Sequence, residues 1–176
     1  MADLETIVST FDAMLRLAQI ESGSQQFHRE TIDLAKLAAE MHEMLLPVAT
    51  DMGHRFELTC DDGLLAVSGD KRMLAQLIVN LVENAFRHCP APATIKLSVR
   101  RMQSDIVLCV KDNGPEIAAD QREKVLRRFF RLEKSQNTSG SGLGLSLVAA
   151  IVRQHEGKLS LLDNLPGLTV EIRFRC

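Results

Sequence analysis

The first 21 residues carry an apolar pattern that is typical of a helix packed on another helix. Leu4, Val8, Phe11, Leu15 and Ala18 recur at alternating steps of four and three residues, which makes a heptad-like seam. A single helix about 20 residues long does not bury such a stripe alone. The pattern therefore favours a partner helix, from the same chain or from a second chain, over simple docking on the domain that follows.

After a polar junction near residues 21–26, the pattern changes to alternating strands and helices. Strands are expected at 30–33, 55–60, 64–67, 94–100, 106–111, 158–162 and 168–174, and helices at 34–51, 70–88 and 142–155. Hairpins mixed with helices predict an α+β fold, a two-layer α/β sandwich in which helices cover one face of a mixed sheet. The chain then divides into residues 1–25, a long helix with its linker, and residues 26–176, the sandwich.

The composition agrees with an ordinary soluble domain and narrows the classes of partner. Apolar residues make up 45% of the chain and charged residues 25%. The net charge of −2 gives no reason to expect a nucleic-acid partner. No apolar run approaches the roughly 20 residues that span a bilayer. The chain is expected to be soluble and cytoplasmic, with reduced thiols at its widely spaced cysteines Cys60, Cys89, Cys109 and Cys176.

Two asparagines interrupt the helix expected at 70–88. At about 100° per residue, Asn80, Asn84 and Arg87 fall together on one flank of the apolar stripe. Asparagine is a poor interior helix former, so a pair of them one turn apart requires an explanation. They supply either two neutral oxygen ligands for a hard cation such as Mg²⁺ or two buried amides that neighbouring backbone satisfies. Glu83 falls opposite the stripe and is expected to be exposed.

Two glycine-containing segments complete the candidate chemistry. Asp112 and Gly114 directly follow a strand, where a carboxylate is able to accept a hydrogen bond from an adenine amine, although an ordinary turn explains this tripeptide equally simply. Gly140, Gly142 and Gly144 open the last helix and expose amide groups to a phosphate. A mononucleotide P-loop is excluded because no Lys-Ser or Lys-Thr follows the glycines. A dinucleotide turn is disfavoured because no strand precedes them, and a flexible lid fits better.

The order and spacing of these segments resemble four sequence boxes of sensor histidine kinases, known as N, G1, F and G2. The match covers about residues 30–174, and residues 11–23 resemble the end of the second helix of that family's dimerisation and phosphotransfer domain. The segments that carry the resemblance are Asn80 with Asn84, Asp112 with Gly114, Arg128-Phe129-Phe130-Arg131, and Gly142 with Gly144.

The resemblance implies a Bergerat-type ATP-binding fold that binds ATP and Mg²⁺. It implies that Asn84 ligates Mg²⁺ with support from Asn80, and that Asn84 and Arg87 take part in catalysis. The remaining implied nucleotide contacts are Arg87, His88 and Arg131 near the phosphates, Asp112 and Gly114 at the adenine, Gly140, Gly142, Leu143 and Gly144 in the lid hinge, and Phe130, with Phe129, as lid anchors.

Two features depart from the family pattern. Glu116 stands where the family has a second G1 glycine, so the adenine-side loop is expected to be displaced or the affinity weakened. None of the histidines has the sequence context of the family's phosphoacceptor, and His155 is expected only to end its helix. The histidines are His28, His42, His54, His88 and His155. The chain is therefore expected to begin inside the second dimerisation helix and to lack the acceptor.

The resemblance implies a function in two-component signalling. The domain would donate the γ-phosphoryl of ATP to a histidine on a dimerisation domain, for relay to an aspartate of a response-regulator receiver domain. The parent is expected to be a homodimeric inner-membrane sensor with this domain on the cytoplasmic side. Two alternatives stay open: a self-contained ATPase of the gyrase, Hsp90 and MutL type, in which a catalytic glutamate takes the place of Asn80, and a degenerate binding module disabled by Glu116.

Overall fold

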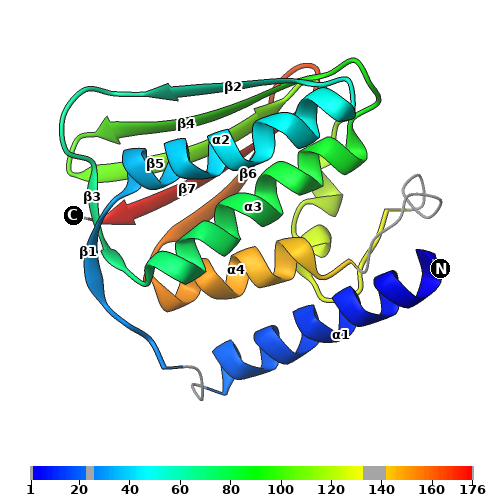
Figure 1. Ribbon diagram of the computed structural model, residues 1–176, viewed down its shortest axis with the longest axis horizontal. Helices are drawn as coiled ribbons and strands as arrows, with labels where there is room; N and C mark the ends of the chain where they lie inside the picture. Colours follow the sequence, from blue (N-terminus) through cyan, green and yellow to red (C-terminus); the bar gives the residue numbers. More distant parts are fainter. Residues whose placement is uncertain (1, 23–25, 133–141, 176) are drawn as a thin grey trace.

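The structure of the protein is a computed structural model that describes residues 2–22, 26–132 and 142–175 (Figure 1). A long N-terminal helix precedes a domain in which strands and helices alternate. None of the helices in these ranges has a stretch long and apolar enough to cross a membrane. In chain order the elements are α1 (Ala2–Glu21), β1 (Glu30–Asp33), α2 (Leu34–Asp51), β2 (Arg55–Cys60), β3 (Ala66–Gly69), α3 (Lys71–His88), β4 (Thr94–Met102), β5 (Asp105–Asp112), the short 3₁₀ turns η1 (Ala119–Gln121) and η2 (Lys124–Leu126), α4 (Gly144–Gln154), β6 (Lys158–Asp163) and β7 (Leu168–Arg175).

Five strands form one mixed sheet in the order β2-β4-β5-β7-β6. Strand β2 runs parallel to β4, and the other neighbours are antiparallel. Helices α2, α3 and α4 lie on one face of this sheet, and α1 packs on the far side of α4 (Figure 1). The predicted α+β sandwich, with a mixed sheet and helices on one face, is therefore confirmed.

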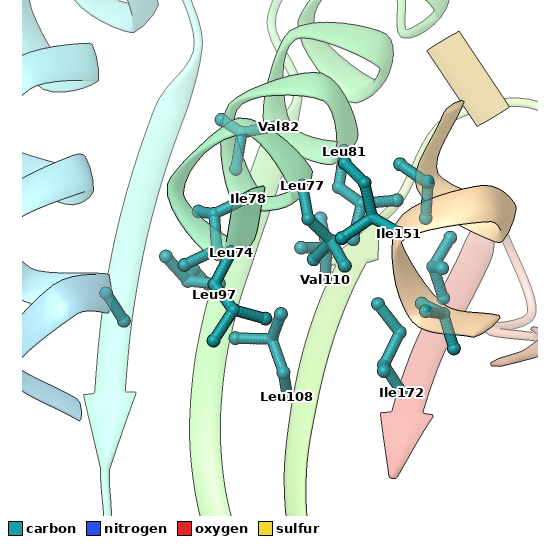
Figure 2. Close-up of a cluster of buried hydrophobic side chains, with 14 of the residues drawn as sticks. Leu74, Leu77, Ile78, Leu81, Val82, Leu97, Leu108, Val110, Ile151 and Ile172 are labelled. Carbon is teal, nitrogen blue, oxygen red and sulfur yellow. The ribbon is translucent and has the colours of Figure 1, made fainter. Parts of the chain in front are cut away.

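The core lies between the inward face of the sheet and helices α3 and α4. Alternate residues of the central strands, such as Leu97 on β4 and Leu108 on β5, point toward the helices and are fully buried. Figure 2 shows them meeting the apolar stripe of α3, including Leu77 and Ile78, and Ile151 of α4. This packing holds α3 in one rotation on the sheet, which also determines where its polar flank faces.

Two aspartates set the beginnings of α2 and α3. The Oδ1 atom of Asp33 accepts hydrogen bonds from the backbone N–H groups of Ala35 and Lys36, and that of Asp70 accepts from Arg72 and Met73. Each bond satisfies an amide group that has no partner within the helix. Both helices begin where the sequence predicts.

Strand β3 is shifted by two residues from its predicted position and α4 begins two residues later than predicted, while the other elements differ by at most two residues at either end. Strand β3 extends from Ala66 to Gly69 and not from 64 to 67, because it pairs antiparallel with β1 over those four residues. Helix α4 begins at Gly144 and not at Gly142, because Gly142 has a φ of +69°, outside the helical region. Both shifts come from pairing and backbone conformation that apolar periodicity does not report.

Helix α1 packs on α4 with the face opposite to its heptad-like seam. Leu17 and Ile20 are buried and Ala13 packs against the core, whereas Val8 and Phe11 of the seam are 53% and 59% exposed. At about 100° per residue the two faces are separated by roughly half a turn of the helix. The helix thus docks on the domain that follows, which was the alternative to a partner helix, and it does so with residues outside the seam. A partner helix for the seam itself stays a prediction.

The linker that follows α1 is tied to the ends of α3 and α4. The backbone N–H of His28 donates to Oδ2 of the capping residue Asp70, at 3.0 Å. The imidazole Nε2 of His155 accepts from the backbone N–H of Asp70 at 3.0 Å, and the ring edge meets Phe27. Since Nε2 accepts, Nδ1 carries the proton and donates to the carbonyl of Ile151 at 2.8 Å. His155 thus holds the linker in addition to ending α4.

The neutral state of His155 makes the free energy of unfolding depend on pH. Burial lowers the pKa of His155 from its ordinary value of 6.5. Below that pH the unfolded chain binds a proton that the folded chain does not, so stability decreases as the pH falls. We expect urea titrations to give a smaller unfolding free energy at about pH 5.5 than at about pH 7.5.

The His155→Gln variant is the matched comparison, because glutamine does not titrate. Its loss of stability between the two pH values should be smaller than that of the unsubstituted protein. The remainder is expected from His88, whose pKa burial also lowers. Equal losses in both proteins would contradict the role assigned to His155.

Candidate functional site

The polar flank of α3 forms one wall of a cavity of about 250 Å³. The other walls come from the end of β5, the segment 115–132, the beginning of α4 and the first residue of β7. The cavity is lined by Asn80, Glu83, Asn84, Ala85, Arg87, His88, Cys89, Asp112, Pro115, Glu116, Ile117, Val125, Phe130, Arg131, Leu132, Gly142, Gly144, Leu145 and Leu168. Polar and charged groups therefore surround a partly apolar hollow, a composition that suits a small organic anion.

Most residues that the sequence singled out meet at this cavity. Those on its wall are Asn80, Asn84, Arg87, His88, Asp112, Phe130, Arg131, Gly142 and Gly144. Gly114 lies directly behind the wall, next to Cys89. Leu143 is instead fully buried in the hydrophobic core. Gly140 lies outside the described residues.

The amide of Asn80 is fixed by its own helix. Its Nδ2 donates to the carbonyl of Gln76, one turn earlier, at 2.9 Å. The amide nitrogen is thus engaged with the helix backbone, which leaves the carbonyl oxygen Oδ1 as the group available to the cavity. Asn84 follows one turn later and lines the same wall. Both explanations of the asparagine pair are therefore compatible at Asn80. The amide nitrogen is bonded to the helix backbone, and the amide oxygen stays available as a ligand.

On another part of the cavity wall, Asp112 is held by three hydrogen bonds. Its Oδ1 accepts from the backbone N–H groups of Gly114 at 2.9 Å and Leu168 at 3.2 Å. Its backbone carbonyl accepts from Nδ2 of Asn164 at 2.6 Å. Gly167 passes so close that an added Cβ would lie 2.0 Å from this carbonyl oxygen. The carboxylate is therefore oriented before any ligand arrives.

A glycine is needed at position 114 because neighbouring atoms leave no room for a side chain, and not because the backbone has a positive φ. A Cβ atom at this position would lie 2.4 Å from Sγ of Cys89 and 3.2 Å from Oδ1 of Asp112. Burial, followed by the Asp112 carboxylate, raises the pKa of the Cys89 thiol to about 12. The thiol is thus protonated near neutral pH and hydrogen-bonded to Asp112. Cys89, Asp112 and Gly114 form one tightly packed unit.

Positive charge gathers around His88. Burial lowers the pKa of His88, and the nearby guanidinium groups of Arg87 and Arg131 lower it further, against the opposing effect of Asp112. His88 is therefore a neutral hydrogen-bonding group near neutral pH, with two permanent cations beside it. The N-terminus of α4 at Gly144 adds the positive end of a helix dipole to the same region.

The segments on either side of residues 133–141 come together at the cavity. A Cβ atom on Gly142 would lie 3.1 Å from both Cγ of Arg131 and the carbonyl oxygen of Phe130. Phe130 lines the cavity, whereas Phe129 is 55% exposed with a φ of +58°. Of the two expected anchors, Phe129 is therefore not in the core, because its left-handed backbone turns the side chain outward.

Glu116 does not distort the loop in the expected way. It lines the cavity and is exposed, but it is not one of the residues with positive φ. The backbone at this place is compatible with any side chain, so the glutamate causes no strain here. Displacement of the loop relative to the family stays a prediction.

Several wall residues were missed in the sequence. Glu83 is exposed, as expected, but it also lies on the cavity rim, three residues after Asn80. That helical spacing was a usable signal. Cys89 directly follows His88 at the end of α3, so its position next to a singled-out residue was also a usable signal. Leu168 carried no comparable signal, because the pairing of β7 with β5 brings it to the site.

No group of three or more His, Cys, Asp or Glu side chains that would bind a metal ion occurs within the described ranges. A cation in the cavity would therefore depend on neutral oxygens, such as those of Asn80 and Asn84, together with oxygens of its ligand. This donor set suits Mg²⁺, which keeps waters and phosphate oxygens around it and binds few protein groups.

A family model described as "Histidine kinase-, DNA gyrase B-, and HSP90-like ATPase" matches residues 69–176. The sensor protein kinase PmrB of Pseudomonas aeruginosa is 32% identical over 172 residues, which are 97% of this chain and 35% of PmrB. The chain thus spans about a third of the length of that relative.

Solved structures show the same fold. The catalytic domain of the histidine kinase ThkA is 25% identical, with a TM-score of 0.75 over 84% of this chain and 97% of that domain. Full-length ShkA in complex with AMPPNP has a TM-score of 0.84 at 20% identity, over 96% of this chain and 35% of ShkA. These similarities agree with the arrangement of sheet and helices described above.

The packing of Gly114 on Cys89 predicts a double-mutant cycle. Gly114→Ala should reduce the free energy of unfolding by roughly 1–3 kcal/mol through overpacking. Adding Cys89→Ala removes the sulfur and should restore a large part of the loss, as a coupling energy between the sites. Urea titrations of the two single variants and the double variant provide the measurement.

Gly144→Ala is the control, because a Cβ there meets no atom within 4 Å. It should leave stability unchanged or raise it by up to about 1 kcal/mol, as expected of alanine in a helix. Additive effects of Gly114→Ala and Cys89→Ala would show that the two side chains do not compete for space.

Proposed function

Since the chain belongs to the family of histidine kinase-, DNA gyrase B- and HSP90-like ATPases, we propose that it is the ATP-binding catalytic domain of a two-component sensor histidine kinase. The observation that carries the proposal is the combination of groups on the cavity wall. An oriented carboxylate at Asp112 lines the same cavity as cations at Arg87 and Arg131, a helix N-terminus and amide oxygens. A purine beside the carboxylate and a triphosphate beside the cations would use both kinds of group.

The adenine is proposed to lie beside Asp112. Because Oδ1 of Asp112 already accepts two backbone hydrogen bonds, Oδ2 is the oxygen proposed to accept from the exocyclic amine. Gly114 leaves room for Cys89 beside the carboxylate, and Ile117 and Leu168 supply apolar wall. ShkA, which has the same fold, was solved with AMPPNP, an analogue of ATP.

The phosphates are proposed to lie near Arg87, His88 and Arg131, at the N-terminus of α4. Asn84 would ligate Mg²⁺ through its amide oxygen, and Asn80 would support it, since its Nδ2 is bonded to the helix. The chemistry that Mg²⁺ supplies there is neutralisation of charge on the phosphate oxygens. Arg87 would stabilise the charge that develops during transfer. Residues 140–144 would form the hinge of the lid.

The reaction is proposed to be phosphoryl transfer to a histidine on a dimerisation domain. The neutral imidazole nitrogen attacks the γ-phosphorus in line, so an N–P bond forms while the bond to the leaving ADP oxygen breaks. The phosphoryl group then passes to an aspartate on a receiver domain.

Helix α1 is proposed to belong to the dimerisation domain, since Val8, Phe11 and Leu15 present an apolar face without a partner in the described part of the chain. The domain boundary falls at residues 25–26.

The parent protein is proposed to be a homodimeric inner-membrane sensor that carries this domain on the cytoplasmic side, as the sensor-kinase names of the relatives suggest. A self-contained ATPase is disfavoured, because Asn80 occupies the place where the resemblance puts that class's catalytic glutamate. A degenerate pocket is disfavoured by the unstrained backbone at Glu116.

Calorimetric titration with an ATP analogue and Mg²⁺ tests the binding mode. Asp112→Asn replaces an acceptor oxygen by a donor and should weaken binding by about tenfold or more, as expected for loss of a hydrogen bond to a charged group. Asp62→Asn is the matched control, since Asp62 is exposed and lies outside the cavity, and it should leave affinity unchanged. No binding heat from the unsubstituted chain would instead favour the degenerate module.

Incubation with γ-labelled ATP tests the assignment of the acceptor to another domain. His28, His42, His54 and His155 lie away from the cavity, and His54 and His155 are engaged with backbone groups. We expect no acid-labile label on the chain alone and no sustained release of phosphate. An acid-labile label on this chain would show that it contains an acceptor, and steady phosphate release would support the ATPase alternative.

A further inference from the structure

The face of the five-stranded sheet that points away from α2, α3 and α4 carries no helix in the described part of the chain (Figure 1). The strand registers place on this face the residues that alternate with the core positions. Seven of them are exposed cations: Arg55, Lys96, Arg100, Lys111, Lys158, Arg173 and Arg175. We call this set the basic sheet face. Its charge contrasts with the net charge of −2 of the whole chain.

The carboxylates on this face lie below the cations. Glu57, Asp105 and Glu171 share the face, but Glu171 is only 5% exposed and the other two are half-buried. Each of the two glutamates holds two cations. Glu57 pairs with Arg55 at 2.5 Å and Lys96 at 3.1 Å, and Glu171 pairs with Arg100 at 3.3 Å and Arg173 at 2.8 Å. The exposed charge that a partner meets is therefore positive throughout.

Cations on this face also stand next to one another. Lys96 lies directly opposite Lys111 across β4 and β5, and Lys158 lies directly opposite Arg173 across β6 and β7. Like charges in such positions destabilise a sheet by up to about 1 kcal/mol per pair. Lys96 and Lys111 also line a small hollow together with the side-chain amide of Asn113. A bound anion would remove the repulsion and would accept hydrogen bonds from all three groups.

We propose that the basic sheet face is a docking surface for a protein surface rich in carboxylates. Glu171 holds the guanidinium groups of Arg100 and Arg173 in place, which prepares them for carboxylates at fixed positions. The surface lies on the side of the sheet opposite to α3, so a partner docked there leaves the ATP cavity accessible. The proposal is independent of the function proposed for that cavity.

Two other polyanions fit the face less well. Anionic membranes are bound by surfaces that combine cations with clustered apolar groups able to insert. Val107 and Cys109 at the centre of this face are buried beneath the cations, and the exposed Met102 and Leu162 lie apart, at opposite ends of the sheet. Single-stranded nucleic acids stack on aromatic side chains, and none of the outward residues on these strands is aromatic. A protein surface requires only charge and shape.

Binding of a deca-glutamate peptide at low salt tests the proposal. The unsubstituted protein should bind this peptide, in a salt-dependent manner, and should not bind deca-glutamine. Lys96→Glu with Lys111→Glu should weaken binding by about tenfold or more. Lys36→Glu with Arg72→Glu changes the net charge equally but alters exposed cations on α2 and α3, and it should weaken binding by less than about twofold.

The double variant Lys111→Gln with Lys158→Gln removes charge without reversing it and is less prone to misfold, because no ion pair of either lysine is found among the described residues. It should weaken peptide binding without lowering the thermal unfolding temperature, which relief of the two like-charge pairs is expected to raise slightly, and ATP affinity should stay unchanged. Equal weakening by the face variants and the control pair would overturn the proposal, since net charge alone would then explain binding. Tighter binding to phosphatidylserine vesicles or to DNA than to the peptide would also overturn it.

Discussion

The packing of α3 on the sheet is the constraint on which the rest of the structure depends. Its apolar stripe has to face the inward residues of β4 and β5, and the rotation that achieves this places Asn80, Asn84 and His88 on the cavity wall. The hydrophobic effect thus orients polar groups that take no part in the core. Any change that turned α3 on the sheet would move all three groups together.

The part of the cavity wall around Asp112 is tightly packed. The carboxylate, Gly114, Cys89 and the turn before Leu168 leave no space for an added carbon atom at Gly114 or Gly167. A wall packed in this way suits recognition of a ring of fixed shape.

Periodicity and capping predicted nearly all of the fold. The boundaries of α2, α3 and the hairpin β4–β5 followed from apolar spacing and from aspartates such as Asp33 and Asp70. The exceptions were β3, whose limits depend on pairing with β1, and the start of α4, which depends on the backbone angle of Gly142. The cavity wall was predictable where it lies on one helix, as for Asn80 and Asn84. It was not predictable where distant strands meet, as for Leu168, which the pairing of β7 with β5 brings to Asp112. The exposure of Phe129 and the outward seam of α1 likewise follow from tertiary packing.

The turn between β6 and β7 carries a consequence for how this domain tolerates change. Hairpin loops are usually where chains accept insertions and substitutions most readily. Here Asn164 donates to the carbonyl of Asp112, and Gly167 passes against the same atom. A loop more than 50 residues away in sequence from Asp112 therefore helps to hold this residue in place on the cavity wall. Insertions, deletions and substitutions that other hairpin loops tolerate should be poorly tolerated in this loop.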